Sequence, residues 1–437
     1  MRIILMRLVT TVLTSLTFRN LRRTLHASRR RLKGATPRVY YFHQADDPYS
    51  HLAVQLLTQL QSRYRVEFVP CLVSAPDDTA APEREKLKQY ALRDAARLAR
   101  RFGLAFVAKP ELPDTSRVEQ TAAALAAAIN MGTFAATAPQ IGMALWTKDD
   151  NALASFAADK AALSTIIAAG DKQREELGHY LGAMFYFEGE WYWGVDRLHH
   201  LETRLTGIGF DTSAAGTPAL APLQDMSLAT KPISPSKPII EYWFSFRSPY
   251  SSISTRRMRK LAHHYNCELR LRFILPMVMR GLPVPLVKRL YITLDAKREA
   301  GNFNEPFGTI VDPVGTGVAR ALAVLHHAIP LGHGEAFAEL GMRAAFADGI
   351  ALASDKGLFD VARRAGLSDE QTRAALADES WQEVAEENRQ ALFDAGLWGA
   401  PSFRVDGKPA HWGQDRFWTL EEDILDAIAA RTATQSQ

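Results

Sequence analysis

The feature that most constrains this chain is a β-rich segment followed by a proline-initiated helix and a second β-rich segment, a pattern that occurs twice. The strand-like segments are 38–43 and 65–73 in the first half, and 239–246 and 268–275 in the second half. A strand, a crossover helix and a second strand form a βαβ unit, in which the two strands pair in parallel. This chain of 437 residues is therefore predicted to contain two α/β domains of one plan.

The two halves also end in related motifs. Gly182–Tyr186 and Trp193–Arg197 close the first half, and Gly399–Phe403 and Trp412–Arg416 close the second. In each half we expect a short hairpin and a last helix at this point. The long interval before the hairpin predicts a helical insertion, with helices at 83–102, 121–146 and 152–169 in the first half and at 286–300, 318–328, 335–348, 355–365 and 369–394 in the second.

These patterns predict four parts of the chain. They are a basic arm at 1–37, a first domain at 38–205, a linker at 206–238 and a second domain at 239–430. The linker is rich in Gly, Ala, Ser, Thr and Pro and lacks the periodicity of a helix or strand.

The arm holds most of the surplus positive charge. Residues 1–38 contain ten Lys and Arg and no Asp or Glu, whereas the formal charge of the whole chain is only +4. Because phosphate binding needs a basic face on the fold itself, we expect no nucleic-acid partner. The apolar stretch 3–18 is too short and too polar to span a bilayer, and no clear secretory cleavage site follows it. We expect either a poorly ordered or loosely docked helix, or a helix lying on an anionic membrane surface.

The two cysteines do not form a redox motif. Cys71 and Cys267 lie in or beside different strand-like segments, and no Cys-x-x-Cys is present. A dithiol centre is therefore excluded, and reduced, buried thiols indicate a cytoplasmic protein. The adjacent histidine pairs at 199–200, 263–264 and 326–327 point to different sides of a helix, so we expect no metal site.

Ser248 is the first candidate functional residue. It follows a strand and precedes Pro249, which suits the first helical position because its missing N–H costs nothing there. Ser248 is thus expected at a helix N-cap, where free N–H groups and the helix dipole favour an anion such as a thiolate. Plain helix capping without a further role is the alternative interpretation.

Two further positions give Ser248 a context. Pro401 begins an expected central strand, which favours a cis Ala400–Pro401 bond or a broken strand, and Ala400 would then be exposed for pairing with an extended peptide. Asp415 is expected at the N-cap of the last helix, where its charge suits an ammonium group. An anion site, a peptide-pairing edge and a carboxylate together fit a small zwitterionic thiol peptide.

With these motifs the second half resembles the kappa-class glutathione transferase and 2-hydroxychromene-2-carboxylate isomerase family, a branch of the DsbA-like thioredoxin group. The resemblance covers about 238–425 and rests on Phe246–Ser251, on Lys288–Tyr291 with Asp295 and Arg298, and on the Gly399–Pro401 and Trp412–Arg416 motifs. It implies a thioredoxin fold interrupted by a helical insertion, with glutathione as cofactor. The expected fold class is therefore α/β, with two tandem thioredoxin-like domains.

The resemblance also implies roles for single residues. Ser248 would assist the glutathione thiolate, Ala400 beside Pro401 would pair with the cysteinyl backbone, and Gln414 with Asp415 would hold the γ-glutamyl end. From the residues themselves, Lys288 is a candidate for binding an acidic substrate or glutathione, or else part of a solvated helix face. Tyr250 is a weaker candidate for substrate contact, and Asp295 with Arg298 is expected to form a structural ion pair.

The first half resembles the same family more faintly. Asp47 stands where the second half has Ser248, and Met184 is aligned with Pro401. Because a carboxylate would repel a thiolate, we expect a degenerate copy without glutathione chemistry. The predicted function is a glutathione-dependent isomerase or transferase acting on a small conjugated or aromatic carbonyl substrate. A non-catalytic binding or chaperone-like protein is the alternative, and a disulfide oxidoreductase is disfavoured by the missing cysteines. The sequence leaves the oligomeric state open.

Overall fold

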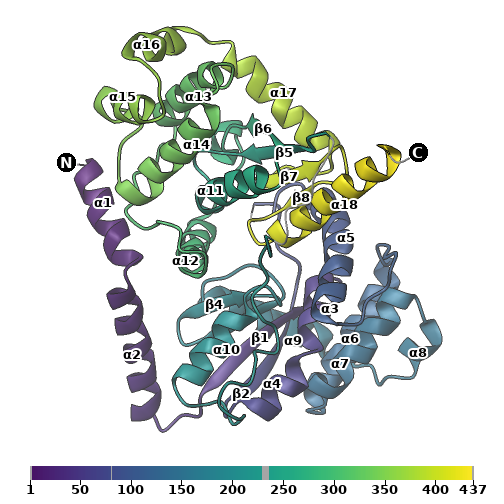
Figure 1. Ribbon diagram of the computed structural model, residues 1–437. Coiled ribbons are helices and arrows are strands. Elements are labelled where there is room, and N and C mark those ends of the chain that lie inside the picture. Colours follow the sequence, from purple (N-terminus) through teal and green to yellow (C-terminus); the bar gives the residue numbers. More distant parts are fainter. Residues whose placement is uncertain (1, 80, 229–235, 436–437) are drawn as a thin grey trace. The chain divides into compact units, whose positions relative to one another are not determined.

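The computed structural model describes all residues except 1, 80, 229–235 and 436–437 (Figure 1). The chain divides into two compact units, each described here by itself. The C-terminal unit comprises Met1–Arg19 and Asp225–Gln437, and the N-terminal unit comprises Asn20–Gln224. The division falls inside the predicted linker, and the predicted arm is shared between the units.

The C-terminal unit is built on a four-stranded sheet. Its strands are β5 (Ile239–Phe244), β6 (Glu268–Phe273), β7 (Ser402–Val405) and β8 (His411–Trp412), in the order β6-β5-β7-β8. β5 runs parallel to β6 and antiparallel to β7, with Tyr242 opposite both Leu271 and Phe403. Five of the six residues of β5 are buried, as expected for a central strand covered on both faces.

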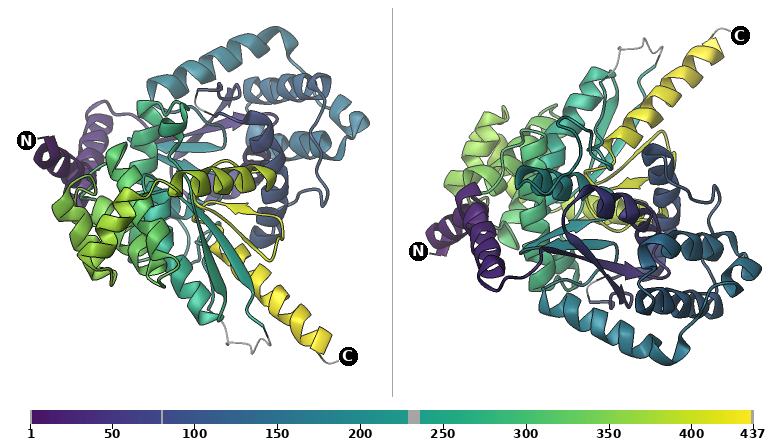
Figure 2. Two further views of the ribbon diagram at one scale, coloured as in Figure 1. Left: turned by 90° about the horizontal axis from the view of Figure 1, so that it is seen from above. Right: turned by 90° about the horizontal axis from the view of Figure 1, so that it is seen from below.

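Helices surround this sheet and form the predicted insertion (Figure 1). α11 (Pro249–His264) is the crossover from β5 to β6, and α18 (Phe417–Gln435) follows β8 and packs against β7. The far end of α18 extends beyond its own sheet (Figure 2). Between β6 and β7 lie α12 (Leu286–Asn302), α13 (Thr316–Ala328), α14 (Gly334–Arg343), α15 (Asp355–Arg364), α16 (Asp369–Ala377) and α17 (Trp381–Asp394), together with a 3-10 turn at Met277–Arg280 and a π turn at Ala344–Asp348.

The N-terminal unit has a sheet of the same topology. Strands β1 (Arg38–Gln44), β2 (Glu67–Val73), β3 (Met184–Phe187) and β4 (Glu190–Trp193) follow the order β2-β1-β3-β4, with β1 parallel to β2 and antiparallel to β3. Its helices are α3 (Pro48–Val54), α4 (Leu57–Arg63), α5 (Arg84–Phe102), α6 (Thr115–Asn130), α7 (Phe134–Thr147), α8 (Asp150–Ala154), α9 (Lys160–Glu176) and α10 (Leu198–Gly207). The predicted α/β class with two similar sheets is confirmed.

Several expected helices are broken in two. The segment 121–146 is interrupted at Gly132, whose φ of +69° ends α6. The segment 369–394 is interrupted where the Asp378 side chain accepts the Ser380 N–H at 2.9 Å, a local turn that competes with the helix. The expected helix that begins at Pro48 also divides into α3 and α4, and the expected helix at 152–169 is divided between α8 and α9. Apolar periodicity continues through these breaks, which is why it did not reveal them.

Carboxylates hold the described parts of the predicted linker to the units on either side. In the N-terminal unit, Glu202 of α10 accepts the Leu220 N–H at 2.8 Å. In the C-terminal unit, Glu421 of α18 accepts the Leu228 N–H at 2.6 Å. Both carboxylates are buried, so each one orders an extended segment that composition alone would class as flexible.

The arm forms two docked helices and is not poorly ordered. α1 (Arg2–Leu13) contacts the helical insertion of the C-terminal unit through threonine hydroxyls. α2 (Leu16–Leu32) contacts the N-terminal unit, where Arg23 and Arg30 form ion pairs with Glu190 and Glu188 at 2.7 and 2.6 Å. Within the described residues, no helix combines the length and the apolar character needed to cross a membrane.

Candidate active site

The start of α11 places Ser248 as predicted. β5 ends at Phe244, a turn follows, and Ser248 takes the N-cap position with an extended backbone. Its Oγ accepts the Ser251 N–H at 3.1 Å, and Pro249 follows at the first helical position. Because α11 is sixteen residues long, the dipole at this end is fully developed. The predicted N-cap is confirmed, and the local sequence alone accounts for it.

Ala400 lies against Ser248, although 152 residues separate them. The Ser248 Oγ–H donates to the Ala400 carbonyl oxygen at 3.1 Å, and the Ala400–Pro401 bond is cis, as expected. The Pro401 carbonyl accepts the Gly413 N–H at 3.0 Å, which joins this segment to the Trp412–Arg416 motif. The helix start and the proline-marked strand start are thus adjacent.

Asp415 differs from its predicted position. α18 begins at Phe417, and Leu420 N–H donates to the Arg416 carbonyl, so Arg416 is the N-cap and Asp415 lies in the preceding turn. The turn is closed by the Arg416 N–H and the Gly413 carbonyl at 3.3 Å. A side chain at Gly413, which has a φ of +114°, would collide with the Asp415 carboxylate. The absence of a side chain at Gly413 therefore leaves room for the Asp415 carboxylate.

Gln414 points into the domain. It is buried, its Oε1 accepts a hydrogen bond from Arg257 at 2.9 Å, and its Nε2 donates to Glu299 at 2.7 Å. Arg257 of α11 and Glu299 of α12 are buried too, and Arg257 also donates to the Gln414 carbonyl at 3.1 Å. The sequence reasoning missed this Arg257–Gln414–Glu299 network because no local pattern links the three elements.

Tyr250 lies on α11, and Lys288 lies on α12, which packs against α11. The Tyr250 hydroxyl donates to Asp295 Oδ2 at 2.7 Å, and Arg298 donates to Asp295 Oδ1 at 2.6 Å, which confirms the predicted ion pair. Lys288 precedes Asp295 by two helical turns, so the two residues share one face of α12. Burial lowers the pKa of Lys288 to about 8. Its amine is still mostly protonated at neutral pH.

The C-terminal unit has no thiol at this site. Its single cysteine, Cys267, follows the far end of α11 and is buried. Burial raises the pKa of Cys267 to about 12. Both Cys267 and Cys71 are unpaired in the structure.

The N-terminal unit repeats much of this arrangement with a different cap. Asp47 caps α3 by accepting the N–H groups of Tyr49 and Ser50 at 3.2 and 2.9 Å. The Tyr49 hydroxyl donates to Asp94 at 2.8 Å, across the same 45-residue separation as Tyr250 and Asp295. Burial raises the pKa of Asp47 to about 6. This cap is therefore mostly anionic at neutral pH.

Sheet register corrects one predicted equivalence. Tyr41 and Tyr242 occupy matching places in the central strands, and they lie opposite Phe185 and Phe403. Counting back along each closing strand places Ala183, and not Met184, at the position of Pro401. The hydrogen bonds agree, since the Ala183 carbonyl accepts the Gly194 N–H at 2.7 Å as that of Pro401 accepts Gly413. Ala183 has a φ of +53°, which a proline ring does not allow.

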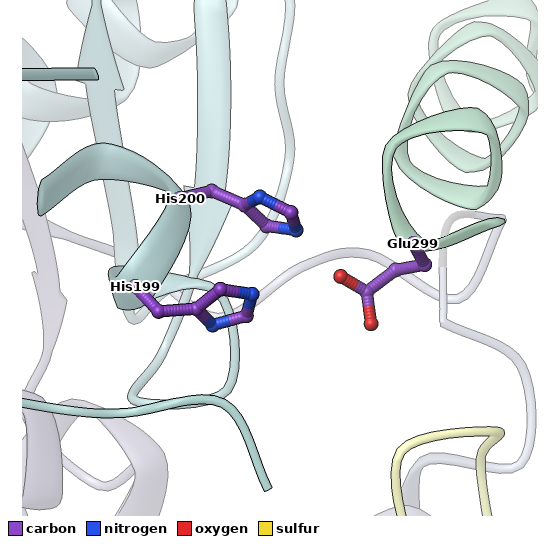
Figure 3. Close-up of side chains that lie close together, drawn as sticks. All are labelled: His199, His200 and Glu299. Atoms are coloured by element: carbon purple, nitrogen blue, oxygen red, sulfur yellow. The ribbon is translucent and has the colours of Figure 1, made fainter. Parts of the chain in front are cut away.

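Figure 3 shows His199 and His200 on α10 together with Glu299 on α12. The histidines belong to the N-terminal unit and the glutamate to the C-terminal unit. Within its own unit, Glu299 accepts a hydrogen bond from Gln414.

Part of the C-terminal half matches a known protein family. Residues 239–425 match the model of the DSBA-like thioredoxin domain. Among solved structures, 2-hydroxychromene-2-carboxylate isomerase is 22% identical, with 46% of this chain and 100% of that chain covered and a TM-score of 0.39. A probable DsbA oxidoreductase from Streptomyces coelicolor is 20% identical, covering 45% and 90%, with a TM-score of 0.36. The cytosolic disulfide reductase DsbM from Pseudomonas aeruginosa with GSH is 16% identical, covering 45% and 99%, with a TM-score of 0.35. No curated protein matches the sequence.

Proposed function

We propose that the DSBA-like thioredoxin domain at 239–425 binds glutathione and uses its thiolate as an isomerase or transferase. The main observation that supports this proposal is the position of Ser248 at the N-cap of α11, in contact with Ala400. The only cysteine of this domain, Cys267, is buried elsewhere. A helix N-terminus of this kind stabilises a thiolate. In this proposal a thiol ligand supplies the sulfur, because Cys267 is buried elsewhere in the domain.

Ser248 and the α11 terminus would hold the sulfur. A helix terminus stabilises an anion by about 0.3–1 kcal/mol, and a hydrogen bond to a charged group adds about 1.5–3 kcal/mol. Because one pKa unit corresponds to about 1.4 kcal/mol, these terms together lower a thiol pKa by roughly 1–3 units. From an ordinary value of about 8.5 that yields a thiolate at neutral pH.

The two hydrogen bonds of Ser248 suggest how it changes partner. The Oγ keeps its role as acceptor of the Ser251 N–H, while its own proton points to the Ala400 carbonyl. A peptide ligand that pairs with Ala400 would take over this carbonyl. The Ser248 hydroxyl could then turn its proton to the thiolate.

Asp415 would bind the γ-glutamyl ammonium group, and Gln414 would act behind it. The Gln414 amide is engaged with Arg257 and Glu299, so its contribution is to fix the turn that carries Asp415. Lys288 would attract an acidic substrate or a glutathione carboxylate, and Tyr250 would border the same region from α11. In the isomerase reaction the thiolate would add to a conjugated carbonyl compound, a bond would rotate or re-form, and the thiolate would leave unchanged; in a transferase reaction the new carbon–sulfur bond would be kept in the product.

The N-terminal unit would be a diverged copy without this chemistry. It shares the strand order and the Tyr–Asp bond described above, but Asp47 would repel a thiolate at the cap. The two reduced cysteines are compatible with a cytoplasmic location, where glutathione is abundant.

Glutathione titration of Ser248→Ala tests the proposal. Ser354→Ala is a matched control, because Ser354 caps α15 with an Oγ to Gly357 N distance of 3.1 Å, equal to that of Ser248. Both variants should lose about 1 kcal/mol of unfolding free energy. Only Ser248→Ala should raise the pKa of bound glutathione, by about 1–2 units, as measured from thiolate absorbance against pH. Failure of the wild type to bind millimolar glutathione would contradict the proposal.

A non-catalytic binding protein is the alternative function. The buried and solvent-shielded Cys267 argues against disulfide exchange at this site, but not against glutathione binding without turnover. Screening conjugated and aromatic carbonyl compounds with glutathione, and comparing the wild type with Ser248→Ala, separates the two. Tight binding with no Ser248-dependent turnover would favour the alternative.

A further inference from the structure

The polar side of α1 faces the protein. The Thr10 Oγ1 accepts the Ile310 N–H at 2.9 Å and lies 3.2 Å from the Ile310 carbonyl, and the Thr14 Oγ1 donates to the Gly308 carbonyl at 3.1 Å. The Asp312 N–H lies 3.1 Å from the Met6 sulfur. These contacts fix the rotation of α1 on the C-terminal unit.

The opposite side of α1 is apolar and faces away from this unit. Five side chains on it are between 53% and 62% exposed, namely Ile4, Leu5, Leu8, Val9 and Val12. Their spacing of one and four residues places them on one face of the helix. A surface helix normally buries its apolar face. In α1 the polar face contacts the protein and the apolar face is exposed. A contiguous exposed apolar patch marks an interaction surface.

The charge of the arm favours a lipid surface over a second copy of the chain. No acidic residue occurs in residues 1–38, and within α1 the basic side chain of Arg7 is exposed. Pairing two copies through α1 would bring two arms of like charge together. At the surface of an anionic bilayer, the apolar face of α1 could be buried among the acyl chains while the basic residues contact the negatively charged headgroups.

We propose that the apolar face of α1 inserts into the interface of membranes containing anionic phospholipids and tethers the protein there. α1 has only twelve residues and lies in the plane of the interface without crossing the bilayer. The tether is independent of glutathione binding, because Ser248 and Ala400 take no part in it.

Vesicle co-sedimentation of the full chain tests this tether. The wild type should sediment with phosphatidylcholine vesicles that contain phosphatidylglycerol, and more weakly with phosphatidylcholine alone. Leu5→Ser with Leu8→Ser should reduce partitioning about tenfold or more, because two apolar anchors are lost. The matched control is Val314→Ser with Leu331→Ser, two exposed apolar residues elsewhere on the same unit, which should partition like the wild type.

Two further measurements keep the outcome decisive. Thermal unfolding should show equal stability for all three proteins, since every substituted side chain is exposed. In Leu8→Trp, the indole emission should shift to shorter wavelength when anionic vesicles are added. Absence of wild-type sedimentation would overturn the proposal. So would a dimer in sedimentation velocity that Leu5→Ser with Leu8→Ser dissociates without any vesicle binding.

Discussion

We expect the stability of the N-terminal unit to depend on pH through Asp47, the residue that caps α3. Ser248, which caps α11 in the C-terminal unit, does not titrate and gives no such dependence. Burial raises the pKa of Asp47 from 3.8 to about 6, against the hydrogen bonds from Ser50 and Tyr49 that favour the carboxylate. The folded state therefore binds this proton more tightly than the unfolded state. The resulting stabilisation is complete below pH 3.8 and is lost as the pH rises through about 6.

The magnitude follows from the two pKa values. A difference of about 2 units corresponds to at most about 3 kcal/mol over the whole titration. Between pH 8 and pH 5 the wild type should gain about 1 kcal/mol from Asp47, since only part of the titration falls in this range and the side chain is partly reached by water. Asp47→Asn should lack this gain while keeping the helix cap, because Asn is as good an N-cap as Asp.

Urea unfolding of the full chain at pH 5 and pH 8 measures the difference. Asp114→Asn is the matched control, because the N–H of Arg117 lowers the pKa of this exposed N-cap carboxyl, which therefore stays ionised at both pH values. Its effect on stability should be the same at pH 5 and at pH 8. Equal pH dependence of the wild type and Asp47→Asn would refute the assignment of the raised pKa to burial at this cap.

Two other outcomes are expected. Glu421→Gln should lower the unfolding free energy by about 1–3 kcal/mol in a denaturant titration, because the buried Glu421 carboxylate accepts hydrogen bonds from the Leu228 N–H and the Tyr265 hydroxyl. The same change at the exposed Glu370 should be nearly neutral. Equal effects of the two substitutions would show that Glu421 does not hold the linker segment in place. Cys267, with its pKa raised to about 12, should alkylate in the native protein at pH 8 far more slowly than free glutathione, and reach the rate of an ordinary thiol in denaturant; rapid native labelling would show that the thiol is accessible.

Several features of the site could be predicted because they are local. The caps at Ser248 and Asp47 depend on side chains that bond N–H groups two or three residues ahead. The doubled strand–helix–strand pattern likewise predicted two sheets of one topology. Helix ends were less predictable, since turns such as the one at Asp378 interrupt an unbroken apolar periodicity.

Other features required the tertiary structure. The observed strand register shows that Ala183, and not Met184, is the counterpart of Pro401. Aligning two short motifs by sequence does not determine which residues pair across a sheet, so the alignment was wrong by one residue. The buried position of Gln414 was also not predictable from the sequence. Its partners Arg257 and Glu299 lie on α11 and α12, and they contact Gln414 only when these helices are packed in the fold.

The sequence by itself determined the duplicated α/β plan, the serine and aspartate caps and the basic, acid-free arm, all of which depend on composition or on neighbours within one helical turn. Only the tertiary structure decided that Ser248 meets Ala400 and that α1 turns its threonines inward and its apolar face outward. The physical reason is that these arrangements join residues 152 and 300 positions apart, and packing of whole elements selects such contacts.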